Sequence, residues 1–174
     1  DVVVADGEAI ETRAGRFEAV ATPGHTANHV AYALAGPAGV LFSGDHVMAW
    51  STTVVAPPDG AMGDYMASLD KLIARRDRIY LPGHGGPVRD PASYVAALKA
   101  HRRAREAAIL ERLSAGDRRI AEIVERVYAG VDPTLHGAAA LSVLAHLEDL
   151  VGRGVVVAEP VPALEATFRP AAGG

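Results

Sequence analysis

The sequence predicts a mixed α/β fold, with a strand-rich first half followed by helices and a second, mostly helical module. Apolar and polar residues alternate over short segments in the first third of the chain, and glycine-containing turns separate these segments. Apolar residues then recur at helical spacing from residue 65 onward. With 49% hydrophobic residues among 174, the chain can bury a core without disulfides, and it has no cysteine to form them.

Turn residues divide the predicted strands of the first half. Asp6-Gly7 and Ala14-Gly15 separate the first three, because glycine accepts the positive φ that a tight hairpin turn requires. Gly36-Pro37 separates the next two. The predicted strands span residues 2–5, 8–13, 17–21, 30–34, 40–42 and 78–81.

Helical spacing predicts a helix over 65–73 and a second helix that ends near Gly116. The second helix begins at Asp90-Pro91, because Asp is a typical N-cap residue and Pro is typical of the first turn. Beyond Asp117 two shorter helical patterns, 120–128 and 137–151, precede a β-rich segment over 155–168. This order is the outline of a winged-helix module. We therefore predict two domains, 1–116 and 117–174.

Composition limits the partners that we expect. The net charge is −4, and the segment from Ala115 onward holds five Arg, no Lys and eight acidic residues, so the sequence predicts no DNA binding. A protein or RNA partner of the winged-helix-like module stays an alternative. No apolar run is long enough to span a membrane, and we expect a cytoplasmic protein without a membrane partner. The oligomeric state is left open.

Three segments share one design, an apolar strand followed by a glycine and a side chain that can bind a metal. They end in His25, Asp45 and His84. Strand ends can meet at one rim, and the glycines allow the turns that direct these side chains. Two imidazoles and a carboxylate suit zinc, or iron and manganese, and a water bound to such a metal is the expected nucleophile.

Each of these residues also has an ordinary interpretation. A histidine after a glycine is commonly a polar surface residue, and an aspartate in a loop can be a turn former. The threefold repetition of the same layout favours the metal site. For the other histidines we expect supporting or packing roles at His29 and His46, and structural or solvent-facing roles at His101, His136 and His146.

The same segments carry a family resemblance. Thr22-Pro23-Gly24-His25-Thr26, Ser43-Gly44-Asp45-His46 and Leu81-Pro82-Gly83-His84-Gly85 resemble the third, fourth and fifth motifs of the metallo-beta-lactamase superfamily. Other stretches resemble its beta-lactamase-like protein 2 branch, which ends in a winged helix: Ser51-Thr52, Pro57-Pro58-Asp59-Gly60, His101-Arg102 with Arg105-Glu106, and Ala145-His146-Leu147.

The resemblance implies an αββα sandwich, of which this chain is the C-terminal half, and a dinuclear zinc hydrolase. It implies that His25 binds the first zinc, that Asp45 bridges the two and is catalytic, and that His84 binds the second. A bridging hydroxide would attack an ester, thioester or phosphodiester, so the expected partner is a small acyl or phosphodiester substrate.

The family's His-x-His-x-Asp-His stretch is absent from these 174 residues. In the family it lies upstream of the part that this chain resembles, so we expect this chain alone to expose sheet surface, to bind zinc weakly and to hydrolyse nothing appreciably. The alternatives are a non-catalytic binding module and a degenerate homologue that never had the other ligands.

The second predicted helix is basic, and Arg102 and Arg105 are candidates for binding an anionic substrate. A solvated helix face is the competing interpretation. Ser51-Thr52 and Tyr65 are candidates for lining the substrate pocket.

Overall fold

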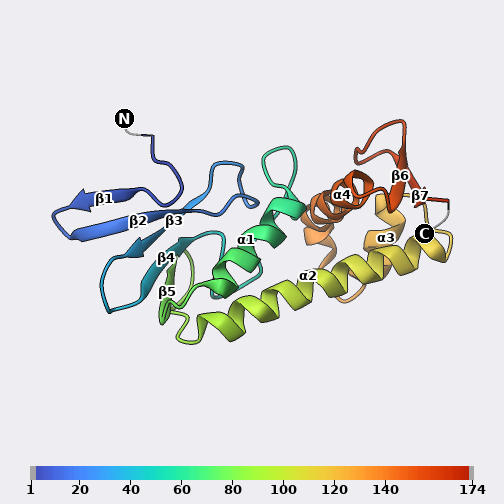
Figure 1. Cartoon of the computed structure of the whole chain (residues 1–174). Coiled ribbons are helices and arrows are strands. Elements are labelled where there is room, and N and C mark those ends of the chain that lie inside the picture. The colour runs from blue at the N-terminus through green and yellow to red at the C-terminus, as the bar shows by residue number, and fades with distance from the viewer. Residues whose placement is uncertain (1–2, 173–174) are drawn as a thin grey trace. The chain divides into compact units, whose positions relative to one another are not determined.

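A computed structural model describes residues 3–172 of the chain. Its internal contacts divide it into two compact units, drawn in Figure 1. The first runs up to Thr53 and takes in Gly63–Lys99, and the second holds Val54–Met62 and the described residues from Ala100 onward.

A five-stranded sheet forms the first unit. Its strands lie in chain order, β1 to β5, and each pair is antiparallel except β4 with β5, which is parallel. The strands are β1 (Ala9–Thr12), β2 (Gly15–Ala21), β3 (Val30–Leu34), β4 (Val40–Gly44) and β5 (Ile79–Pro82). The mixed α/β prediction is confirmed. The strand predicted over 2–5 is wrong for Val3 to Ala5, which form no strand, and Val2 lies outside the described residues.

Helix α1 (Met62–Ala74) follows β4 in the chain and leads into β5, as a parallel strand pair requires. Its Leu69 and Leu72 are fully buried, as are the sheet residues Ala31 and Leu41. The Tyr80 hydroxyl donates to the Leu72 carbonyl at 3.3 Å, which ties the helix to β5.

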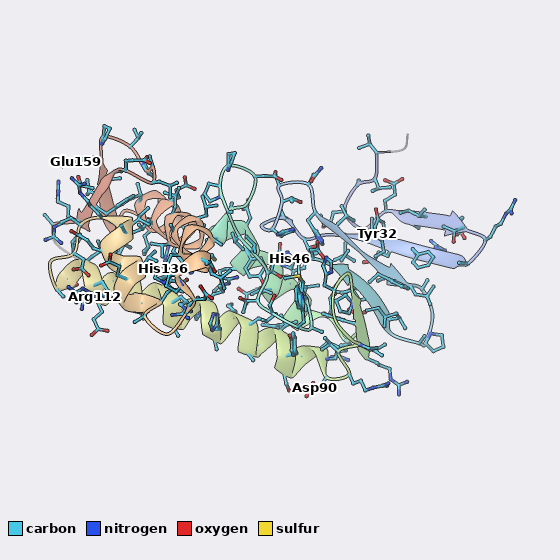
Figure 2. All side chains as sticks on the ribbon, turned by 180° about the vertical axis from the view of Figure 1, so that it is seen from behind. Tyr32, His46, Asp90, Arg112, His136 and Glu159 are labelled. Carbon is cyan, nitrogen blue, oxygen red and sulfur yellow. The ribbon has the colours of Figure 1, made fainter. Side chains whose placement is uncertain are left out.

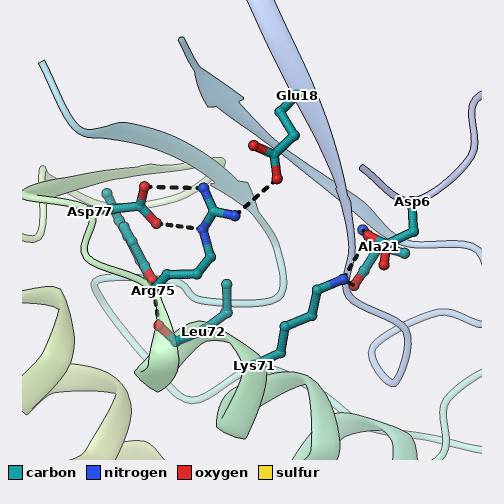
Figure 3. A network of polar contacts seen from close by, with 8 residues as sticks. Asp6, Glu18, Ala21, Lys71, Leu72, Arg75 and Asp77 are labelled. Atoms are coloured by element: carbon teal, nitrogen blue, oxygen red, sulfur yellow. Dashed lines mark hydrogen bonds and ion pairs between the residues drawn. The ribbon is translucent and has the colours of Figure 1, made fainter. Parts of the chain in front are cut away.

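Ion pairs join Arg75, the residue after α1, to β2, and Lys71 of α1 to the segment before β1 (Figure 3). Arg75 lies 2.7 Å from Asp77 and 3.2 Å from Glu18. Lys71 donates to Asp6 at 2.6 Å and to the Ala21 carbonyl at 2.9 Å. These contacts hold the helix beside the C-terminal end of β2, the end that leads to His25.

Aromatic side chains lie on the outward-facing positions of the sheet. Tyr32 and Phe42 are cross-strand partners with 37% and 39% of their surface exposed, and Phe17 meets Phe42 edge-on at 5.9 Å between centroids. Together with Ile10 and Thr12 they line a shallow cavity of about 510 Å³. Figure 2 labels Tyr32 on this sheet. An exposed apolar sheet face of this kind is a docking or aggregation surface.

The second unit contains three helices and a hairpin. α2 (Pro91–Ser114) begins in the first unit and ends in the second, and is followed by α3 (Ile120–Val127), the short 3₁₀ helix η1 (Pro133–Leu135) and α4 (His136–Gly152). β6 (Val156–Glu159) and β7 (Thr167–Pro170) pair antiparallel. The core of this unit is built from residues of all these elements except η1, among them Ile109, Leu113, Ile123, Leu147, Val156 and Phe168.

Buried in this unit, His146 on α4 is 1% exposed and neither of its ring nitrogens has a hydrogen-bond partner. Burial lowers the pKa of His146 to about 3, and the nearby cations, Arg102 first among them, act in the same direction. The imidazole is therefore neutral when the protein is folded, whereas in the unfolded chain it takes up a proton below about pH 6.5.

Because the unfolded state binds the additional proton, this group removes stability as the pH falls from about 6.5 toward 3. We expect the free energy of unfolding of His146→Leu to fall less steeply than that of wild type as the pH decreases. The difference in slope is about 1.4 kcal/mol per pH unit between pH 6 and 5. Urea unfolding at pH 7, 6 and 5 measures this difference. His84→Gln, at an exposed histidine of the first unit, is the control, and parallel profiles for His146→Leu and wild type would contradict the assignment.

Candidate metal centre

The sheet topology brings the three candidate ligands to one edge. β2 and β4 are both antiparallel to β3, and β5 is parallel to β4, so the C-terminal ends of β2, β4 and β5 lie on the same side of the sheet. His25, Asp45 and His84 follow these three ends. The convergence that the sequence predicts for the strand ends is thus a direct result of the strand directions.

Asp45 and His84 are the two candidates that come together. The Nε2 atom of His84 lies 3.6 Å from Oδ1 of Asp45, and the two side chains are 59% and 39% exposed. The loops that carry them are joined by a hydrogen bond from the Gly83 N–H to the Gly44 carbonyl at 2.9 Å. A Cβ atom on Gly83 would lie 2.7 Å from Oδ1 of Asp45, so a larger residue there would require the carboxylate to shift.

His25 lies beside His29 and not in a three-ligand cluster. The rings of His25 and His29 are 6.3 Å apart between centroids and nearly perpendicular. Nδ1 of His29 pairs with the Thr22 hydroxyl at 2.8 Å. Burial and the neighbouring His25 lower the pKa of His29, which favours the neutral imidazole.

His46 forms the buried floor of this edge. It has no exposed surface, and its ring lies 5.6 Å from that of His29 and 4.6 Å from that of Tyr65. Burial lowers the pKa of His46 to about 3, and the nearby His29 acts in the same direction. A neutral imidazole in the interior fits the packing role that the sequence predicts.

Tyr65 is fully buried and its hydroxyl donates to the His46 carbonyl at 3.2 Å. The expectation that Tyr65 lines a substrate pocket is therefore wrong, because helical spacing placed it on the face of α1 that enters the core. Ser51 and Thr52 are exposed. The adjacent Thr53, which sequence reasoning missed, is buried and donates from its hydroxyl to the carbonyls of Asp45 at 2.7 Å and His46 at 3.0 Å.

The two candidate substrate-binding arginines lie in the second unit. Arg102 is only 5% exposed and donates to the Ser142 hydroxyl at 3.3 Å. Arg105 donates to the Val127 carbonyl at 2.8 Å and lies over the Tyr128 ring, 4.4 Å from its centroid. These contacts hold α2 against α3 and α4. A role in binding substrate stays a prediction for both residues.

Nitrogen and carboxylate donors of this kind suit zinc or iron. Within residues 3–172, however, no group of three or more His, Asp or Glu side chains could hold a metal ion. The candidate donors therefore fit a metal centre in kind but not in number.

Comparison with known proteins identifies the family. The metallo-beta-lactamase superfamily matches residues 1–84, and the beta-lactamase associated winged helix domain matches residues 120–161. The chain belongs to the metallo-beta-lactamase superfamily. Members of this superfamily commonly bind zinc or iron. A beta-lactamase-like protein 2 homolog from Drosophila melanogaster is 32% identical over 159 residues, which are 87% of this chain and 51% of the relative.

Solved structures agree with this assignment. A beta-lactamase domain protein from Burkholderia ambifaria superposes with a TM-score of 0.84 at 27% identity, over 97% of this chain and 52% of that one. A metallo-beta-lactamase family protein from Thermus thermophilus gives 0.81 at 28% identity, over 96% and 53%. The chain thus spans about half the length of these metallo-beta-lactamase relatives.

A third relative adds a named activity. An atrochrysone carboxyl ACP thioesterase from Emericella nidulans is 27% identical over 130 residues, which are 73% of this chain and 41% of that protein.

None of the helices within residues 3–172 is both long and apolar enough to cross a membrane.

The approach of α1 to the loop before His25 gives a stability prediction. Gly24 has φ +128°, and a Cβ there would lie 2.3 Å from the Tyr65 backbone. Gly36 has φ +110° with no atom within 4 Å of such a Cβ. We expect Gly24→Ala to cost about 1–3 kcal/mol more than Gly36→Ala, because only the first adds a clash to the backbone strain. Urea unfolding of both variants tests this, and equal losses would show that the close approach is absent.

Proposed function

We propose that this chain supplies His25, Asp45 and His84 to the dinuclear zinc centre of a hydrolase that acts on a thioester. The observation that supports it most is the Asp45 and His84 pair at an open sheet edge, 3.6 Å apart. His25 follows the end of β2, which lies at the same edge and is separated from β4 by β3. The remaining ligands would come from a part of the protein that these 174 residues do not contain. The match to only about half of the relatives' length supports this division.

Each side chain has a role in this proposal. The Asp45 carboxylate would be shared by two cations and would offset their repulsion, and His25 and His84 would each hold one of them through a ring nitrogen. The chemistry that such metals supply when bound is activation of water and polarisation of the scissile carbonyl. Hydrolysis then consumes one water, breaks the C–S bond and yields a carboxylic acid and a thiol.

A thioester is preferred over a phosphodiester for two reasons. Five of the curated relatives that match this chain bear the name thioesterase, among them the one from Emericella nidulans. Several arginines of the second unit are also engaged in ion pairs, so they are less suited to holding a nucleic acid. Arg126 pairs with Asp117, Arg153 with Glu106, and Arg169 with Glu159. The proposed partner is thus a small acyl substrate.

Metal content tests the ligand assignment. We expect the 174-residue chain alone to hold close to no zinc after dialysis against metal-free buffer, because two or three donors are fewer than a stable site requires. Elemental analysis provides the measurement. One or two tightly held zinc ions per chain would overturn the division of the site between this chain and the rest of the protein.

Ligand variants of the whole protein test which metal ions each residue holds. We expect Asp45→Ala to lose both metals or their coupling, since it removes the group shared between them, and His84→Ala to lose mainly one. Elemental analysis and thioester turnover are measured together. Val161→Ala, at an exposed position of the second unit, is the control for nonspecific damage. Full metal and full rate in either ligand variant would show that the assignment is wrong.

The arginines of α2 give a separate test of substrate binding. If Arg102 and Arg105 bind an anionic substrate, alanine at either position raises KM in the whole protein while metal content holds. If they act only through Ser142 and Tyr128, the variants lower the unfolding midpoint and leave KM unchanged. Initial rates and thermal unfolding distinguish the two outcomes.

A further inference from the structure

One aromatic side chain beside the candidate metal centre is mostly exposed to solvent. Trp50, the single tryptophan of the chain, is 72% exposed. Its ring lies 6.2 Å from the ring of His84, between centroids, at an angle of 41°. An exposed tryptophan is a large apolar surface left in water, and such surfaces commonly mark binding sites.

The loop that carries Trp50 is fixed on both sides. The N–H of Ala49 donates to the His84 carbonyl at 3.0 Å, and a Cβ on Gly85 would lie 2.8 Å from the Ala49 backbone. On the other side, Thr53 holds the carbonyls of Asp45 and His46. The indole is therefore presented next to His84 by an anchored backbone.

A cavity of about 480 Å³ begins at Ala49, the residue before Trp50. Its walls come from the loop after β5 and the first turn of α2, and include Val88, Arg89 and Tyr94. The Tyr94 hydroxyl donates to the Met48 carbonyl at 2.8 Å, so the ring is held in place. This hollow is shallow and open to solvent, so it could contact one side of a small organic molecule.

From these contacts we infer that Trp50 is a specificity-determining residue, which stacks a flat, aromatic acyl group of the substrate beside His84. The inference rests on the proposed thioester hydrolysis. The far end of the acyl group would enter the cavity at Ala49. Stacking on the indole favours planar groups over short aliphatic ones, because offset stacking adds to the gain from burying apolar area.

The charges around the pocket favour an acyl group over a nucleobase. Arg89 is the one cation among the lining residues, and the carboxylate of Asp90 is beside it. A single-stranded nucleic acid would need a basic groove that follows its backbone as well as a stacking ring. The residues that line this cavity supply one cation next to one carboxylate, which is less than such a groove requires.

The test uses the whole protein with two thioesters of N-acetylcysteamine, benzoyl and acetyl. We expect Trp50→Leu to lower kcat/KM for the benzoyl thioester roughly tenfold, mainly through KM, while acetyl turnover stays within about twofold. Trp50→Phe keeps a flat ring and is expected to recover most of the benzoyl activity. Leu135→Ala, which also truncates an exposed apolar side chain but one that belongs to no candidate site, is the control.

Binding is measured without turnover by fluorescence. The signal of Trp50 is the difference between the spectra of wild type and Trp50→Phe, and we expect an S-benzyl thioether analogue to quench it and an S-ethyl analogue to leave it unchanged.

Equal losses on both thioesters, or a Trp50→Leu variant that matches wild type, would overturn the inference and leave the thioesterase proposal intact. Quenching by an RNA oligomer at lower concentration than by the benzyl analogue would also overturn it, in favour of a nucleobase. If wild type hydrolyses neither thioester, the proposed function fails and the inference fails with it.

Discussion

The parallel pairing of β4 with β5 is the constraint on which the candidate site depends. Two neighbouring strands that run in the same direction end at the same edge, so the side chains that follow them become neighbours although a long crossover through α1 separates them in the chain. The hydrogen bond from Gly83 to Gly44 continues this pairing one residue beyond the strands. Asp45 and His84 are therefore held by backbone contacts, so their proximity does not depend on their attraction for each other.

This edge has a buried side and an open side. Below it, His46 and Tyr65 are fully enclosed, and burial keeps the His46 imidazole neutral by lowering its pKa. Above it, His84 and Trp50 face solvent. An ion held at the boundary would have rigid support from the interior and access to substrate from water, which is the arrangement that an open catalytic metal site needs.

The sequence predicted most of the elements and the strand ends, because period-two and helical spacing are local signals and glycines mark the turns. It could not predict which face of a helix meets which neighbour. Tyr65 was expected in the pocket and is buried. Arg102 and Arg105 are three residues apart on one helix face, and their partners come from α3 and α4, far away in the chain. The exposure of Trp50 depends on contacts with the loop after β5, and no local pattern marks it.

Two features of the first unit have the same explanation under the proposed function. Within the described residues the donors of the site are too few for a metal, and the aromatic face around Tyr32 and Phe42 is exposed. A tetrahedral zinc needs four ligands, and a sheet face with adjacent aromatic rings gains free energy when it is covered. A single additional layer that packs on this face and ends at the same edge would satisfy both requirements, because the ligands and the aromatic rings belong to the same sheet. The metal would then be stable only when the sandwich is complete, so that folding of the two layers and formation of the active site are coupled.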